Sequence, residues 1–97
     1  TRTQVLVTIF PELLNESLET LSFLRSHTIN AEIFLEENAR MDKQLKYADK
    51  KGIPYVAIIG PDEVKNGTVT LKNMQTKEQK TIPIKEIVHV IPSEAIA

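Results

Sequence analysis

Three short apolar segments, separated by stretches long enough to form helices, constrain the fold of this chain more than any other feature. They span residues 4–10, 30–35 and 55–59, and they contain the β-branched and aromatic residues that favour strands. Because a connection that contains a helix returns the chain to the same end of the sheet, these strands are expected to be parallel. Apolar residues on both faces of residues 55–59 indicate a central strand covered on both sides.

Two amphipathic helices are predicted between these strands. The first spans residues 12–27, and its apolar stripe comprises Leu14, Leu18, Leu21 and either Phe23 or Leu24. The second is expected to be capped by Asn38 or Asp42 and to end at Gly52. Its apolar positions are Met41, Leu45 and Ala48.

The pattern changes after Gly60. Residues 61–65 read as a short turn or helical turn, and Asn66-Gly67 is a strong turn signal. Strands over residues 68–74 and 79–82 are too close together for a helical crossover, so they should pair as an antiparallel hairpin. Ile84, Ile87, Val88 and Ile91 then predict a last helix that ends near Pro92.

The expected fold is therefore α/β, with a five-stranded mixed sheet of three parallel strands plus an antiparallel hairpin, flanked by three helices. Residues 1–97 are expected to form a single domain, because 97 residues suffice for one core. The apolar runs are far too short to cross a bilayer, so we expect a soluble, cytoplasmic protein with no membrane partner. A net charge of -1 means that any nucleic-acid site must rest on local charges.

Catalytic groups are not evident. The absence of cysteine excludes disulfides, thiolate catalysis and cysteine-ligated zinc. His27 and His89 lack the neighbours of a metal site or a nucleophile, and residues 60–63 lack the glycines and lysine of a phosphate-binding loop. Asp62 and Glu63 could form an acid–base pair, but adjacent carboxylates after a strand more often cap the following turn. No catalytic residue and no metal ligand is expected.

One long segment resembles a known family. The stretch KQLKYADKKGIPYVAIIG at residues 43–60, followed by residues 62–64 and by GTVTLKNM at residues 67–74, is similar to the anticodon-binding domain of histidyl-tRNA synthetases. The resemblance implies the five-stranded fold derived above. It also implies a parent enzyme that joins histidine to its tRNA, works as a homodimer, and holds ATP and magnesium on a separate N-terminal catalytic domain. This chain would then be the parent's C-terminal domain, with no cofactor of its own.

The resemblance also implies where RNA would bind. In the related threonyl-tRNA synthetases, the Glu after the strand-ending Gly and an Arg in the next strand contact anticodon bases, and Glu63 and Lys72 stand at the matching positions. Glu63 is the predicted acceptor from a base edge, and Lys72 is the predicted donor to a base or phosphate. Lysine in place of arginine loses the bidentate fork.

The second helix adds further candidates. We expect phosphate contacts from Lys43, Lys46 and Lys50. Candidate base contacts are Gln44, Tyr47 and Asn73. All of these residues are expected to share one groove with Glu63 and Lys72, so that the partner would be the anticodon loop of histidine tRNA. The lysines are equally compatible with a solvated helix face, and Tyr47 with a packing role.

Two other functions remain open at this point. The first is a synthetase-like domain of a regulatory protein, such as a kinase or a polymerase accessory subunit, that senses RNA or mediates dimerisation. The sequence of the parent chain before Thr1 would distinguish it from a synthetase. The second is a small metabolite-binding enzyme, which would need a concave pocket with convergent polar groups.

Overall fold

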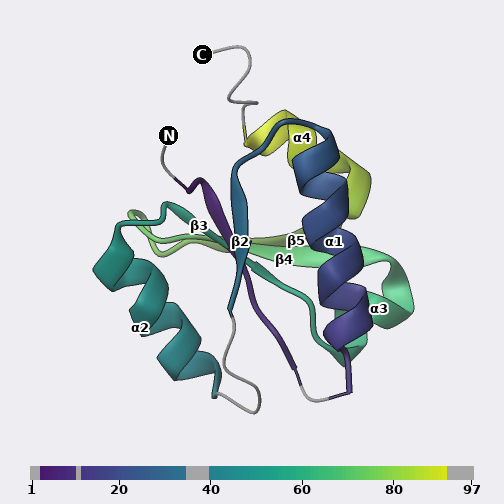
Figure 1. The fold of residues 1–97 in the computed structure, drawn as a ribbon, viewed down its shortest axis with the longest axis horizontal. Coiled ribbons are helices and arrows are strands. Elements are labelled where there is room, and N and C mark those ends of the chain that lie inside the picture. Colours follow the sequence, from purple (N-terminus) through teal and green to yellow (C-terminus); the bar gives the residue numbers. More distant parts are fainter. Residues whose placement is uncertain (1–2, 11, 35–39, 92–97) are drawn as a thin grey trace.

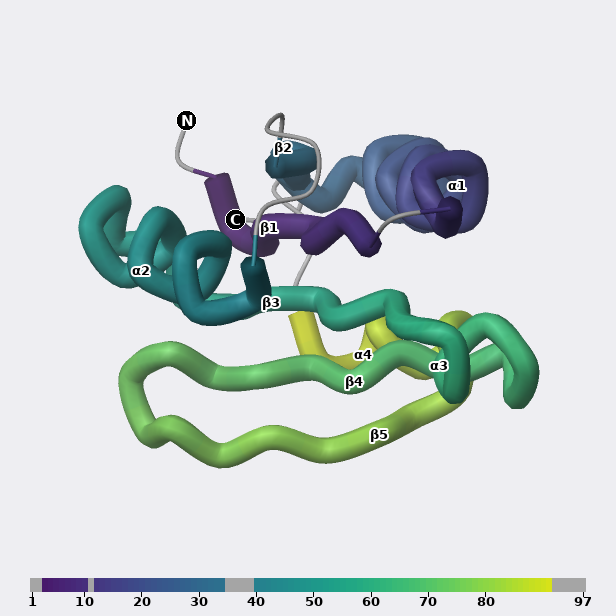
Figure 2. The backbone as a smooth tube through the Cα atoms, turned by 90° about the horizontal axis from the view of Figure 1, so that it is seen from below, coloured from purple at the N-terminus to yellow at the C-terminus, as the bar shows by residue number. Residues whose placement is uncertain are grey.

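The computed structural model describes residues 3–10, 12–34 and 40–91. The predicted five-stranded mixed sheet is confirmed, with the strand order β2-β1-β3-β4-β5 that Figure 2 shows from top to bottom. The strands are β1 (Val5–Val7), β2 (Ala31–Ile33), β3 (Tyr55–Ile58), β4 (Thr68–Asn73) and β5 (Gln79–Pro83). β1 lies parallel to β2 and β3, whereas β4 is antiparallel to both β3 and β5.

Helices cover both faces of the sheet. They are α1 (Leu14–Ser26), α2 (Met41–Lys51), α3 (Pro61–Asn66), the 3-10 helix η1 (Ile84–Glu86) and α4 (Ile87–Val90). In Figure 1, α2 lies on one side of the strands, and α1, α3 and α4 lie on the other. The predicted last helix is thus split into η1 and α4, and its expected end at Pro92 lies outside the described residues. No helix in the described part of the chain is long and apolar enough to span a membrane.

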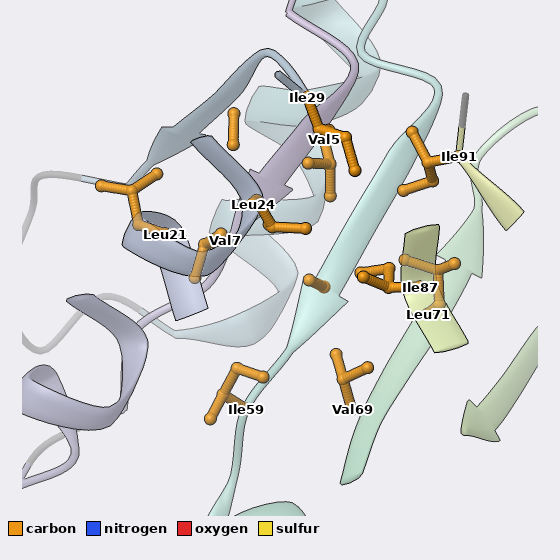
Figure 3. Packing of buried hydrophobic residues seen from close by; sticks show 12 residues of the cluster. Val5, Val7, Leu21, Leu24, Ile29, Ile59, Val69, Leu71, Ile87 and Ile91 are labelled. Carbon is orange, nitrogen blue, oxygen red and sulfur yellow. The ribbon is translucent and has the colours of Figure 1, made fainter. Parts of the chain in front are cut away.

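Two hydrophobic cores follow from this arrangement. The larger core lies between the sheet and the helices α1 and α4, and Figure 3 shows it from close by. It includes Val5 and Val7 from β1, Leu21 and Leu24 from α1, and Ile87 from α4. The smaller core lies under α2 and consists of Leu6, Phe34, Ala48, Ile53, Val56 and Met74. Successive residues of β1 enter different cores, as expected for a strand that is buried on both faces.

The predicted first helix needs two corrections. Glu12 has a φ of 72°, so it is not helical, and α1 begins at Leu14. Leu14 and Leu18 are exposed, with 41% and 42% of their surfaces accessible, and the buried face of α1 includes Ser17 and Thr20. The reason is a hydrogen bond of 2.8 Å from the Ser17 hydroxyl to the Thr8 carbonyl, which anchors this face of α1 against the end of β1.

The predicted apolar face of the second helix is also partly wrong. Ala48 is buried as expected, but its buried companion on α2 is Gln44, and Met41 and Leu45 are only partly buried. Arg40 is the N-cap residue and Asp42 lies inside the first turn, while Asn38 lies outside the described residues. Gly52 ends the helix as predicted, with a left-handed φ of 72°.

Candidate nucleic-acid interface

Glu63 is held in place by two hydrogen bonds at the start of α3. Its Oε1 accepts the backbone N–H of Gly60 at 2.9 Å, which is the glutamate half of a capping box, and its Oε2 accepts the hydroxyl of Thr70 on β4 at 2.7 Å. The Thr70 and Thr81 hydroxyls are 2.9 Å apart, so the chain of hydrogen bonds continues to β5. The side chain of Glu63 is therefore bonded directly to the N-cap of α3 and to β4, and it is linked to β5 only through Thr70.

Glycine at position 60 leaves room for the close approach of the Glu63 side chain. A Cβ atom there would lie 2.9 Å from Oε1 of Glu63 and 3.2 Å from Cζ of Phe10. The strand-ending glycine that accompanied Glu63 in the sequence motif is thus the residue that allows the carboxylate to fold back onto the backbone.

Lys72 lies on the same face of the sheet as the bonded Glu63 carboxylate. Val69 and Leu71 point into the larger core, so Thr68, Thr70 and Lys72 point to the opposite face. Lys72 follows Thr70 by two residues, which is about 7 Å along a strand. Opposite them on β5 are Gln79 and Thr81. We call this surface the Glu63 face: it consists of Glu63, Thr68, Thr70, Lys72, Gln79 and Thr81.

The lysines of α2 belong to a different surface. A hollow of about 460 Å³ lies between α2 and the end of β2. Its lining, which defines what we call the α2–β2 hollow, is Glu32, Ile33, Phe34, Lys43, Lys46, Tyr47 and Lys50.

Tyr47 is fixed within this hollow by several contacts. Its hydroxyl donates a hydrogen bond of 3.1 Å to Oε1 of Glu32, and its ring packs edge-on against Phe34 at 5.3 Å between centroids. The ammonium of Lys51 lies 5.8 Å from the centre of the ring. Partial burial raises the pKa of the Tyr47 hydroxyl above its ordinary value, and the hydrogen bond to Glu32 and the charge of Glu32 act in the same direction. The packing alternative for Tyr47 therefore has direct support.

The expectation of a single groove is corrected by this geometry. β2 is an edge strand, and β1 and β3 lie between it and β4. Three strand spacings separate β2 from β4, or roughly 14 Å. The sequence placed Lys43, Lys46 and Lys50 on one helix face correctly, but it could not tell which neighbour that face adjoins.

Gln44 and Asn73 also differ from the prediction. Gln44 is only 1% exposed, and its side-chain amide both accepts from the Ile9 N–H and donates to the Ile9 carbonyl, each at 2.9 Å. It closes the space between α2 and β1 and does not reach the surface. Asn73 lies on the opposite face from Lys72 by strand alternation, and its Oδ1 accepts the N–H groups of Gln75 and Thr76 in the hairpin turn.

Thr70 and Thr81 were given no role by the sequence analysis. The alternation of β4 was sufficient to place Thr70 beside Lys72, but Thr81 became its neighbour only through the register of the hairpin. His27 and His89 are exposed at helix ends. Within the described residues, no cluster of three or more histidine, aspartate or glutamate side chains could hold a metal ion.

Comparison with known proteins identifies the family. The sequence model of the family described as "Anticodon binding domain" matches residues 4–94 of this chain. The chain belongs to the anticodon-binding domain family. This assignment agrees with the resemblance in residues 43–74 and extends it to nearly the whole chain.

Individual members of the family are similar over most of this chain. The histidine–tRNA ligase of Clostridium tetani is 37% identical over 91 residues, which cover 94% of this chain and 20% of that protein. The histidine–tRNA ligase of Danio rerio is 38% identical over 89 residues, which cover 91% of this chain and 17% of that protein. The crystal structure of histidyl-tRNA synthetase from Nostoc sp. PCC 7120 has a TM-score of 0.87 at 31% identity and covers 93% of this chain and 22% of that one. The chain thus spans about a fifth of these relatives.

Proposed function

We propose that this anticodon-binding domain recognises the anticodon loop of histidine tRNA as the C-terminal part of a histidine–tRNA ligase. The parent would act in the cytoplasm as a homodimer, and its separate catalytic domain would use ATP and magnesium to attach histidine. Membership of the family and the ligases among its relatives support this proposal. The structural observation that carries it is the fixed carboxylate of Glu63, which the Gly60 N–H and the Thr70 hydroxyl hold beside β4, the strand on which strand alternation turns Lys72 to the same side as Thr70.

Glu63 retains acceptor capacity beyond its internal hydrogen bonds. A carboxylate offers about four lone-pair positions, and the bonds from Gly60 and Thr70 occupy two of them. The remaining positions suit the N–H groups on the Watson–Crick edge of an unpaired base such as guanine. Lys72 would donate to a base oxygen or a phosphate as a point charge. Because the carboxylate is already oriented, binding a base would cost little side-chain entropy.

A substitution at Glu63 tests the base-reading role. A histidine-tRNA anticodon hairpin and a hairpin with an altered anticodon would be titrated against the chain by fluorescence anisotropy. We expect Glu63→Ala to reduce the ratio of the two affinities by about tenfold, since a specific base contact contributes about 1–3 kcal/mol of discrimination. Asp62→Ala is the matched control, because it removes an exposed carboxylate from the same turn and should leave the ratio unchanged.

Two results would argue against this role. If Glu63→Ala lowers the affinity for both hairpins by the same factor, Glu63 only caps α3. Equal binding of both hairpins by the unchanged chain would remove anticodon reading altogether. The ligase parentage is tested separately, by assaying histidine attachment to tRNA with the longer protein that contains this chain.

A further inference from the structure

We infer that the α2–β2 hollow is a second RNA-binding surface, one that takes nucleotides outside the anticodon triplet and contributes affinity without reading sequence. This inference rests on the proposed function. It separates two contributions that the sequence had combined in one groove, namely base reading at the Glu63 face and strand binding at α2.

The charge of the hollow favours an anionic partner. Lys43, Lys46 and Lys50 lie along one side of α2 at helical spacings of three and four, so their side chains follow one another along the rim. Glu32 is the one carboxylate in the lining. Its Oε2 accepts the Thr3 hydroxyl and its Oε1 accepts the Tyr47 hydroxyl, so neutral groups hold this carboxylate, while Lys46 and Lys50 are exposed at the rim.

The floor of the hollow favours a partner that is also partly apolar and flat. Ile33, Phe34 and the ring of Tyr47 form this floor, and Phe34 and Tyr47 hold each other in an edge-on arrangement at 5.3 Å. A ribonucleotide offers both properties, because its phosphate pairs with ammonium groups and its base or ribose covers apolar and aromatic surface. Phe34 is only 8% exposed, so the ring of Tyr47 provides the aromatic surface, and a fixed aromatic ring among lysines is typical of surfaces that bind single strands without sequence preference.

The distance between the two surfaces decides which nucleotides the hollow would take. β2 and β4 carry the strand residues of the two surfaces and are three strand spacings apart, or roughly 14 Å, whereas a stacked triplet advances by only about 7 Å along its axis from its first nucleotide to its third. A triplet bound at the Glu63 face therefore does not extend to the hollow. The hollow would receive the flank of the anticodon loop or the adjoining stem.

The test uses RNAs of two lengths and two matched double variants. Lys46→Ala/Lys50→Ala removes two exposed ammoniums from the hollow, and Lys80→Ala/Lys85→Ala removes two exposed ammoniums from β5 and η1. For the anticodon hairpin, we expect the first variant to bind at least about tenfold more weakly and to lower the salt slope by about 1.4–1.8 units. The loss should be equal for cognate and altered anticodons. For Lys80→Ala/Lys85→Ala, the hairpin affinity and the salt slope should stay close to those of the unchanged chain.

A trinucleotide with the anticodon sequence should behave differently. In NMR titrations we expect it to shift the amides of Thr70 and Lys72 but not those of Ile33 and Phe34, and its affinity should be the same for Lys46→Ala/Lys50→Ala and the unchanged chain. The hairpin should shift both sets of amides.

Three outcomes would overturn the inference. The first is an equal effect of the two double variants on the hairpin. The second is a loss of trinucleotide binding in Lys46→Ala/Lys50→Ala. The third is that Lys46→Ala/Lys50→Ala weakens the binding of an acidic peptide but not the binding of RNA, which would assign the hollow to a protein partner. Failure of the proposed function is distinct, since it would appear as equal affinity of the unchanged chain for cognate and altered anticodons.

Discussion

Glu63 combines a structural and a proposed recognition role in one side chain. Its Oε1 closes the N-terminus of α3, and its Oε2 connects α3 to β4 through the Thr70 hydroxyl. The sequence presented capping and function as alternatives, whereas the geometry makes them compatible. A carboxylate that is fixed by capping needs no reorganisation when a base arrives, so the structural bonds would prepare the binding geometry.

Thr70 is therefore expected to act as a positioning residue for Glu63. Thr70→Val keeps the shape of the side chain but removes the donor to Oε2, so Glu63 should become mobile and discrimination between anticodons should fall several-fold. Thr70→Ser restores the hydroxyl and should restore discrimination. The free energy of unfolding should fall by about 1–3 kcal/mol in the valine variant only, because buried partners lose their hydrogen bonds. Hairpin titrations and urea unfolding measure the two effects.

Thr68→Val on the same face is the matched control for this experiment. It should retain discrimination. If Thr70→Val is less stable but discriminates as well as the unchanged chain, the threonine supports the fold alone and does not position Glu63 for a base.

Gln44 illustrates how a polar residue of the motif can belong to the interior. Gln44→Leu retains the volume but leaves the N–H and carbonyl of Ile9 without their partners. We expect the free energy of unfolding to fall by about 1–3 kcal/mol, as is usual for a buried hydrogen bond that loses one partner. RNA affinity of the folded protein should be unchanged, since the residue is 1% exposed. Unchanged stability with weaker RNA binding would return Gln44 to the candidate base contacts.

At the scale of single elements, the sequence predicted which segments are helices but not which way their faces turn. Apolar spacing pointed to Leu14 and Leu18 on α1, yet a hydrogen bond from Ser17 to β1 turns these leucines outward. On α2, the hydrogen bond from the Ile9 N–H to Gln44 likewise turns Gln44 inward, and Met41 and Leu45 are only partly buried. Hydrophobic periodicity does not reveal such positions, because a polar side chain that bonds to a strand backbone is as stable inside as an apolar one. The rotation of α2 in turn decides which surface its lysines join.

The connection after α1 contains strain that a substitution should relieve. Thr28 has a φ of 57°, a left-handed conformation that is unfavourable for a β-branched residue. We expect Thr28→Gly to raise the free energy of unfolding by up to about 1 kcal/mol, because the relief of strain exceeds the extra backbone entropy of glycine. Thermal unfolding monitored by circular dichroism measures it.

Ser26→Gly provides the comparison for Thr28→Gly. Ser26 is the last residue of α1, where glycine brings no relief of strain and should lower stability by a few tenths of a kcal/mol to about 1 kcal/mol. A decrease of similar size in both variants would mean that the Thr28 hydroxyl, which donates to the His27 carbonyl at 2.6 Å, outweighs the strain.

At the scale of the whole molecule, the sequence predicted strand directions but not the position of each strand in the sheet. The helical crossovers predicted that the first three strands are parallel, and the short connection between the last two strands predicted that they are antiparallel. That β2 lies at one edge and β5 at the other depends on packing between distant segments. This order separates Lys46 from Lys72, and it explains why two surfaces were predicted as one groove. With a net charge of -1, both surfaces would act through local charges.

The same strand order predicts a gradient of local stability across the sheet. β1 and β3 each pair on both sides, and the residues of β1 are 0% exposed, whereas β5 pairs only with β4 and four of its five residues are exposed. Because local opening is easiest where few apolar contacts are lost, we expect the amides of β1 and β3 to exchange with solvent most slowly and those of β5 fastest among the strands. Native-state hydrogen exchange at two protein concentrations measures this order. Slow exchange in β5 at both concentrations would show that the exposed hairpin is more stable than its burial implies. Slow exchange only at the higher concentration would show that a second copy of the chain covers it.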